Sequence, residues 1–268
     1  MSIYGWTDCP EPIVRQLTAL RDHLIDYVGH NLVGIYVHGS LALNSFNPDV
    51  SDLDVIVLLR EGLVLELRYE LVKLFLALSN QPAPIEISVI ALDAIWPWKH
   101  PTPFQLHSSE YWRKAYEEQI GRENKQFWAE TPVDPDLACH ITLILQRGIC
   151  LYGKPAQEVF PSVPEQDFRS SILSGVDHAA DAVQTAPVYG ILTLCRILSY
   201  LETGMIISKE EAGQWVLARI PEHIRYVVRQ AADTYVGPVQ ASAEYRVEDL
   251  EEYKRLMLAA IHVHVNKA

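Results

Sequence analysis

The sequence predicts two domains, an α/β domain with a mixed sheet over residues 1–157 and an α-helical bundle domain over residues 158–268. Short β-rich apolar runs alternate with helical patterns in the first 90 residues, and the strand signal fades beyond residue 100. Prolines punctuate the middle of the chain, where residues 153–164 have the composition of an inter-domain connection. After it, only helical periodicity remains. We expect ligands to bind in the cleft between the two domains, which would close on binding.

The first domain contains two helical patterns and three strand patterns. In chain order they are a helix over Glu11–Val28, a strand over Leu32–Val37, a strand over Leu53–Leu59, a helix over Glu66–Leu78 and a strand over Ile85–Ala91. The second of these strands is a nearly continuous apolar run, the pattern of a strand that is covered on both faces. The order α-β-loop-β-α-β therefore predicts a mixed sheet with helices.

The second domain contains five helical patterns. They cover Gln166–Gln184, Tyr189–Thr203, Glu210–Arg219, Glu222–Tyr235 and Val247–Val265. In the second of them, Ile191, Leu194 and Leu198 form one apolar stripe, while Arg196 faces elsewhere. Such amphipathic helices bury their apolar stripes against one another, which predicts a helical bundle.

Charge and composition exclude several classes of protein. The chain of 268 residues has 34 acidic and 22 basic residues, and this excess of negative charge argues against a nucleic-acid binder. The absence of an apolar run of roughly 20 residues argues against a membrane span. The four cysteines are scattered, which is typical of reduced thiols in an intracellular protein. We expect a cytoplasmic monomer with no nucleic-acid or membrane partner.

One group of residues indicates chemistry. Gly39 permits a sharp turn after a strand, and Ser40 with neighbouring backbone N–H groups can hold a phosphate. Asp52 and Asp54 are two residues apart on a strand, so both carboxylates point to one face. Two convergent carboxylates favour a cation, and Mg²⁺ shared between carboxylates and phosphate oxygens is the usual solution. If the next strand lies alongside, Glu86 brings a third carboxylate.

This pattern resembles the glycine-serine and DxD signature of the nucleotidyltransferase superfamily. Further segments look like the aminoglycoside 3''/9-nucleotidyltransferases, the streptomycin and spectinomycin adenylyltransferases. They are Ile85–Val89, Trp96–Trp98, Phe104–Leu106, Glu110–Trp112, Asp134–Ala138, Val163–Asp167, Leu192–Arg196, Thr203–Gly204 and Ser208–Lys209. The resemblance covers nearly the whole chain, including the helical domain, and implies a nucleotidyltransferase fold in the first domain.

The resemblance also implies roles for individual residues. Asp52 and Asp54 would bind Mg²⁺, and Glu86 would take the proton from the acceptor hydroxyl. The nucleotide would contact Gly39 and Ser40 in the first domain and three residues of the second, Arg196, Lys209 and Tyr235. Trp112 would line the acceptor pocket together with Glu86.

The residues implied by resemblance alone also have purely structural interpretations. Arg196 suits a solvated helix face, and Lys209 precedes two glutamates at a helix start. Trp112 and Tyr235 suit packing positions. His38, beside Gly39, suits either a phosphate contact or a packed histidine at a strand end.

One segment departs from the family pattern. The position that aligns with the family's key drug-recognising aspartate is Ala186, so a cationic drug would lose a charged partner there. Asp177 and Asp181 are the nearby acids that could substitute for it.

We expect an enzyme that transfers AMP from Mg·ATP to a hydroxyl of a cationic aminoglycoside or aminocyclitol antibiotic. It would release pyrophosphate and confer resistance. Two alternatives remain: a nucleotidyltransferase with another small-molecule or protein acceptor, and a non-catalytic nucleotide-binding regulatory module of the same fold.

Overall fold

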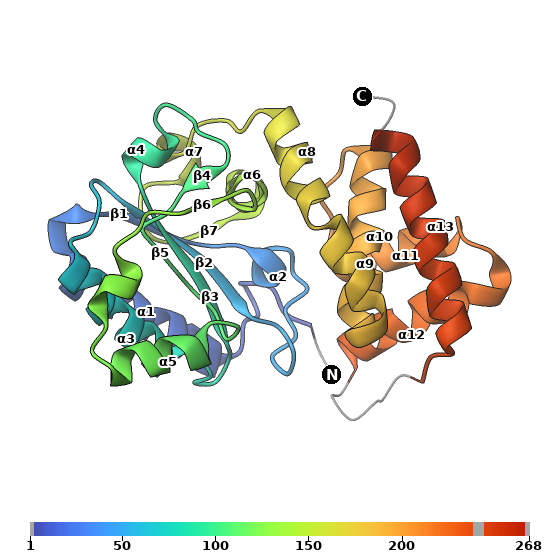
Figure 1. The fold of residues 1–268 in the computed structure, drawn as a ribbon, viewed down its shortest axis with the longest axis horizontal. Coiled ribbons are helices and arrows are strands. Elements are labelled where there is room, and N and C mark those ends of the chain that lie inside the picture. The colour runs from blue at the N-terminus through green and yellow to red at the C-terminus, as the bar shows by residue number, and fades with distance from the viewer. Residues whose placement is uncertain (1–2, 238–243, 266–268) are drawn as a thin grey trace. The chain divides into compact units, whose positions relative to one another are not determined.

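The computed structural model describes residues 3–237 and 244–265, which form two compact units. Tyr4–Ser171 make an α/β unit, and the described residues 172–265, with Ile3, make a helical unit (Figure 1). The predicted architecture, a mixed sheet with helices followed by a helical region, is confirmed. Within the described ranges, no helix is long and apolar enough to cross a membrane.

A five-stranded sheet forms the centre of the α/β unit, in the order β5-β3-β2-β1-β7. Its strands are β1 (Leu32–Val37), β2 (Leu53–Leu59), β3 (Ile85–Ala91), β5 (Leu106–Ser108) and β7 (Ile149–Gly153). β2 and β3 are parallel, and the other neighbouring pairs are antiparallel. β4 (Thr102–Pro103) and β6 (Val133–Asp134) form a separate two-stranded sheet. The predicted bounds of the first three strands are confirmed.

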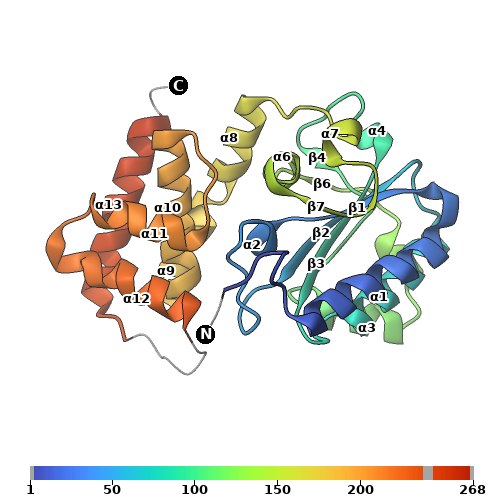
Figure 2. The ribbon, with the colours of Figure 1, turned by 180° about the vertical axis from the view of Figure 1, so that it is seen from behind.

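Helices cover both faces of this sheet. Near one face lie α1 (Glu11–Val28), α3 (Leu65–Leu78) and α5 (Arg113–Gly121), and near the other lie α4 (Leu92–Ile95), α6 (Leu137–Arg147) and α7 (Ala156–Val159) (Figure 1). The helices α1 and α3 run side by side (Figure 2). Alternate residues of β2 enter the two cores, Val55 and Val57 on one side and Ile56 and Leu58 on the other. This double coverage explains why the run is apolar throughout.

The sequence did not predict the strands beyond residue 100. β4 and β6 have two residues each and β5 has three, too short to show an alternating pattern. The segment 153–164, expected as a connection, instead packs on the sheet, since Ala156 and Phe160 are buried in the core beside α6.

The helical unit surrounds α10 (Pro187–Thr203), which packs against α9 (Val176–Thr185), α11 (Lys209–Leu217), α12 (Arg225–Val236) and α13 (Val247–Val265). The predicted single helix over 166–184 is wrong, because α8 (Glu165–Ser174) ends before Gly175 and α9 starts after it. The helix predicted from Glu222 begins as the 3₁₀ turn η3 (Glu222–Ile224).

The α/β unit contains three further short elements, η1 (Gly29–Asn31), α2 (Gly39–Ala42) and η2 (Lys125–Trp128).

Candidate active site

The topology of the sheet brings Asp54, Glu86 and the turn at Gly39 together. β1 is antiparallel to β2, and β2 is parallel to β3, so the end of β1 meets the beginnings of β2 and β3. Asp54 and Glu86 are direct partners in the parallel register. The His38 N–H donates to the backbone carbonyl oxygen of Asp54 at 2.9 Å, which holds the turn after β1 beside the beginning of β2. Asp52 lies just before β2, two residues from Asp54.

Gly39 is required at this turn for two reasons. Its φ of +63° lies in the left-handed region that favours glycine. In addition, a Cβ at this position would lie 1.6 Å from Asp54 Oδ2, so the backbone passes directly against the carboxylate. The following Ser40 has a buried Oγ with no hydrogen-bond partner among the described residues. A buried hydroxyl without a partner is costly unless a ligand satisfies it, which fits a phosphate oxygen.

The environment of Glu86 makes it hard to ionise. Burial is the main cause that raises the pKa of the Glu86 carboxyl to about 7, and the negative charge of Asp54 adds to it. Asp52 also raises the pKa of this carboxyl, whereas His140 lowers it. A carboxyl whose pKa lies near neutral pH is well matched to accept a proton from a hydroxyl.

These acids suit a metal that is shared with a substrate. Among the described residues, no group of three or more histidine, cysteine, aspartate or glutamate side chains could hold a metal ion on its own. Mg²⁺ binds through one or two carboxylates together with substrate phosphates and water. Asp52 and Asp54, beside the unsatisfied Ser40 hydroxyl, match that requirement for a metal that arrives with a nucleotide.

The sequence analysis did not single out two residues that influence Glu86, His140 and Asp134. His38 packs beside His140. The His38 ring is buried and its centroid lies 4.7 Å from that of His140, and burial followed by the neighbouring imidazole lowers the pKa of His38 well below its usual value. His38 is thus a packed histidine. His140 and Asp134 both act electrostatically on Glu86. No sequence signal pointed to His140, because the helix α6 that carries it was not predicted.

Trp112 is not a core residue. It immediately precedes α5, its exposed fraction is 39%, and it stacks on Tyr116 with ring centroids 6.0 Å apart. Tyr111 beside it is 85% exposed. A partly exposed, stacked indole can receive a flat ligand face.

In the helical unit, the structure brings two of the three predicted nucleotide contacts together. Lys209, the first residue of α11, places its Nζ 5.2 Å from the ring centroid of Tyr189 and 5.5 Å from that of Tyr235. Arg196 is half-buried on α10. Tyr189 was missed by sequence reasoning, since it begins a helical pattern and carries no motif.

The segment before α10 contains the position that lacks the expected acid. Ala186 joins α9 to α10, and Pro187 begins α10. Asp181, one of the two possible substitutes, forms an ion pair of 3.1 Å with Lys254 and has an 85% exposed side chain. Asp177, the other substitute, lies in the first turn of α9.

Comparisons with known proteins agree with this two-part organisation. Residues 18–100 match the nucleotidyltransferase domain, and residues 158–260 match the C-terminal domain of aminoglycoside adenylyltransferase. A spectinomycin 9-adenylyltransferase of Staphylococcus aureus is 29% identical over 80% of this chain and 81% of that protein. An aminoglycoside (3'')(9) adenylyltransferase of Escherichia coli is 27% identical over 95% of this chain and 97% of that protein. The fold also matches a spectinomycin adenylyltransferase from Enterococcus faecalis, solved with ATP and spectinomycin, at a TM-score of 0.79 and 24% identity, covering 93% of this chain and 99% of that one.

Proposed function

We propose, from the premise that this chain belongs to the aminoglycoside 3''/9-adenylyltransferase family of the nucleotidyltransferase superfamily, that it transfers AMP from ATP to an antibiotic hydroxyl. The acceptor class is an aminoglycoside or aminocyclitol such as spectinomycin or streptomycin, and the transfer would confer resistance. The observation that carries the proposal is the register of Asp54 with Glu86 beside the Gly39–Ser40 turn.

The reaction is a direct displacement at phosphorus. The acceptor hydroxyl oxygen forms a bond to the α-phosphorus of ATP, the bond to the bridging oxygen breaks, and pyrophosphate leaves. Glu86 accepts the hydroxyl proton, which its raised pKa favours, and general-base catalysis of this kind is worth about 10²–10⁴-fold in rate.

Asp52 and Asp54 would hold Mg²⁺, which when bound neutralises charge on the phosphate oxygens. Ser40 supplies the hydroxyl that a phosphate oxygen would satisfy, and the close approach of Gly39 to Asp54 fixes that carboxylate in place. In the helical unit, Arg196, Lys209 and Tyr235 are the further proposed nucleotide contacts, and the Lys209 ammonium can offset charge on the departing pyrophosphate. Trp112 is the proposed contact to the acceptor.

Pyrophosphate release from Mg·ATP, with spectinomycin and streptomycin added separately, tests the proposal. Glu86→Gln should remove most of the acceptor-dependent release and leave Mg·ATP binding intact. Glu66→Gln, the same change at an exposed position of α3, is the matched control and should behave like the wild type. Asp52→Ala and Asp54→Ala should each abolish transfer. Release that depends on the acceptor but not on Glu86 would refute the assignment of the base.

A second candidate is the same chemistry with another acceptor, and Ala186 is the observation that favours it. Tight Mg·ATP binding without release in the presence of either drug would support this candidate. Binding of ATP with no turnover on any sugar-like or protein hydroxyl would instead indicate a nucleotide-binding regulatory module.

A further inference from the structure

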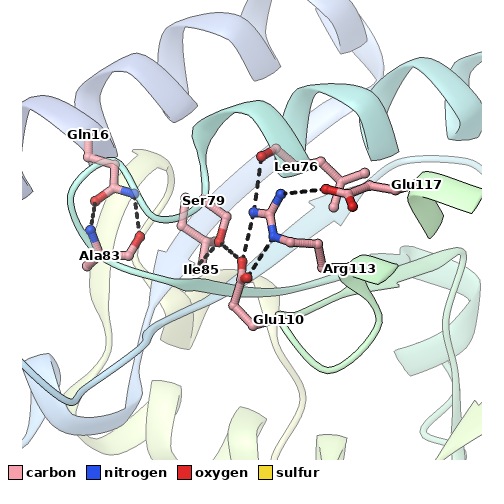
Figure 3. A network of polar contacts seen from close by, with 8 residues as sticks. All are labelled: Gln16, Leu76, Ser79, Ala83, Ile85, Glu110, Arg113 and Glu117. Atoms are coloured by element: carbon pink, nitrogen blue, oxygen red, sulfur yellow. Dashed lines mark hydrogen bonds and ion pairs between the residues drawn. The ribbon is translucent and has the colours of Figure 1, made fainter. Parts of the chain in front are cut away.

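A polar network on the α1–α3 side of the α/β unit connects the beginning of β3 to the segment that leads into α5 (Figure 3). None of its side chains belongs to the proposed catalytic group. Its members nevertheless flank that group, because Ile85 immediately precedes Glu86 and Glu110 lies two residues before Trp112. We infer that Glu110 is a positioning residue for the transfer reaction, and this inference rests on the proposed function.

The first link is a relay of hydrogen bonds through Ser79. The backbone N–H of Ile85 donates to Ser79 Oγ at 2.9 Å, and Ser79 Oγ donates to Glu110 Oε1 at 2.5 Å. A serine hydroxyl has a single proton to donate. Since the Glu110 carboxylate takes that proton, a lone pair of Ser79 is left facing the Ile85 N–H. Glu110 thereby fixes the direction of the bond that holds the first residue of β3.

The second link holds the carboxylate itself. Arg113 donates to Glu110 from Nε at 2.7 Å and from Nη2 at 2.9 Å, a bidentate pair that is only partly exposed. These hydrogen bonds from Arg113 are the main cause that lowers the pKa of the Glu110 carboxyl to about 2, with Ser79 contributing. Arg113 also donates to the Leu76 carbonyl oxygen at 3.2 Å, which attaches the pair to α3.

The third link is the position of Glu110 in the chain. Arg113 is the first residue of α5, so the bidentate pair closes over the turn that carries Trp112. The backbone of that turn is bonded as well, with the Trp112 N–H donating to the Ser109 carbonyl oxygen at 3.0 Å. The Glu110 carboxylate therefore helps to position both the strand that carries the proposed base and the turn that carries the proposed acceptor contact.

The expected consequence is a loss that concerns the acceptor more than the nucleotide. Glu110→Gln replaces one of the two acceptor oxygens with an NH₂ donor, which cannot accept from Arg113 or Ser79, and Ser79→Ala removes the relay. Each should lower kcat/KM for the acceptor by about 10- to 100-fold, the effect expected of a misplacement of up to about 1 Å at reacting groups. The KM for ATP should stay unchanged, because Ser40, Asp52 and Asp54 lie outside the network.

Steady-state kinetics on the full chain, with thermal denaturation alongside, tests the inference. Ser79→Thr keeps the hydroxyl and should restore turnover. Glu117→Gln is the matched control, since Glu117 accepts from the same Arg113 at 3.3 Å without contacting Ser79. It should keep wild-type kinetics. The Ser79→Ala/Glu110→Gln double variant should lose no more than the worse single variant, because the Ser79 relay acts through Glu110.

The inference would be overturned by additive losses in the double variant, by an equal rise in the KM for ATP, or by the same loss in Glu117→Gln. Wild-type protein with no acceptor-dependent pyrophosphate release would refute the proposed function, and this inference with it. An active wild type with unchanged Glu110→Gln and Ser79→Ala kinetics would refute the positioning role alone.

Discussion

Replacing the proposed base with a neutral isostere should stabilise the protein at high pH while it removes activity. The Glu86 carboxyl has a pKa of about 7 in the folded chain, against its usual value of 4.5. The folded state therefore holds this proton more tightly than the unfolded state. The stabilisation is complete below pH 4.5 and is lost as the pH rises through 7. The glutamine of the Glu86→Gln variant has no proton to lose, so the variant escapes this penalty.

The magnitude follows from the two pKa values. Between pH 5 and pH 8, the linkage relation gives a loss of about 2–3 kcal/mol for wild type relative to Glu86→Gln. For a unit of this size, the Tm of Glu86→Gln should rise relative to that of the wild type by about 5–10 °C between pH 5 and pH 8. The sign is unusual for an active-site substitution, because most substitutions of native residues destabilise.

Thermal denaturation in metal-free buffer measures the effect. Wild type and Glu86→Gln are melted at pH 5 and at pH 8, with Glu66→Gln as an exposed control that should follow the wild type. If the Tm of the wild type and the Tm of Glu86→Gln change equally between pH 5 and pH 8, then burial and the Asp54 charge do not destabilise the ionised carboxyl. That result would refute the raised pKa of Glu86.

Four further predictions concern the site and the cores. The rate of transfer should rise with pH through about 7, and a pH–rate profile of Glu86→Gln should lack this rise. Gly39→Ala should cost at least about 1–2 kcal/mol in chemical denaturation, because φ is +63°, and should abolish turnover by displacing Asp54. Lys209→Ala should raise the KM for ATP and leave the KM for the acceptor unchanged, which initial-rate kinetics would measure. Tyr253→Phe should lower the free energy of unfolding by about 1 kcal/mol, because the buried hydroxyl loses its 2.9 Å bond to a carbonyl oxygen of α10.

The sequence was most informative where a residue's neighbours lie close along the chain or where a whole run is buried. The bounds of β2 and β3 were predicted correctly because both strands are covered on both faces and are therefore apolar almost throughout. β7 was missed because Cys150 and Tyr152 fill its exposed positions between the half-buried Ile149 and Leu151, so its sequence shows no alternation of apolar and polar residues. The break at Gly175 was missed because helical periodicity continues through it.

For the site, sequence reasoning was limited to residues that share a motif. Asp52 and Asp54 were recognisable from their spacing, whereas the pairing of Asp54 with Glu86 depends on a parallel register between strands separated by α3. The same limit applies to the contact between Ser79 and Glu110, which are 31 residues apart. Ser79 carries no local signal, and Glu110 lies in a segment that resembles the family without a role implied for this residue.

The candidate active site contains side chains that destabilise the fold. Asp54 and Glu86 occupy directly opposed positions on two strands whose remaining residues are almost all buried, and like charges there repel. Ser40 adds a buried hydroxyl without a partner among the described residues. An apolar residue at each of these buried or half-buried positions would pack better, so packing gives no reason for them. Their common requirement is a ligand that carries cations and phosphate oxygens together, which is the form in which Mg·ATP would arrive. Local conflicts of this kind are expected at functional sites, and this one lies within the match to the nucleotidyltransferase domain.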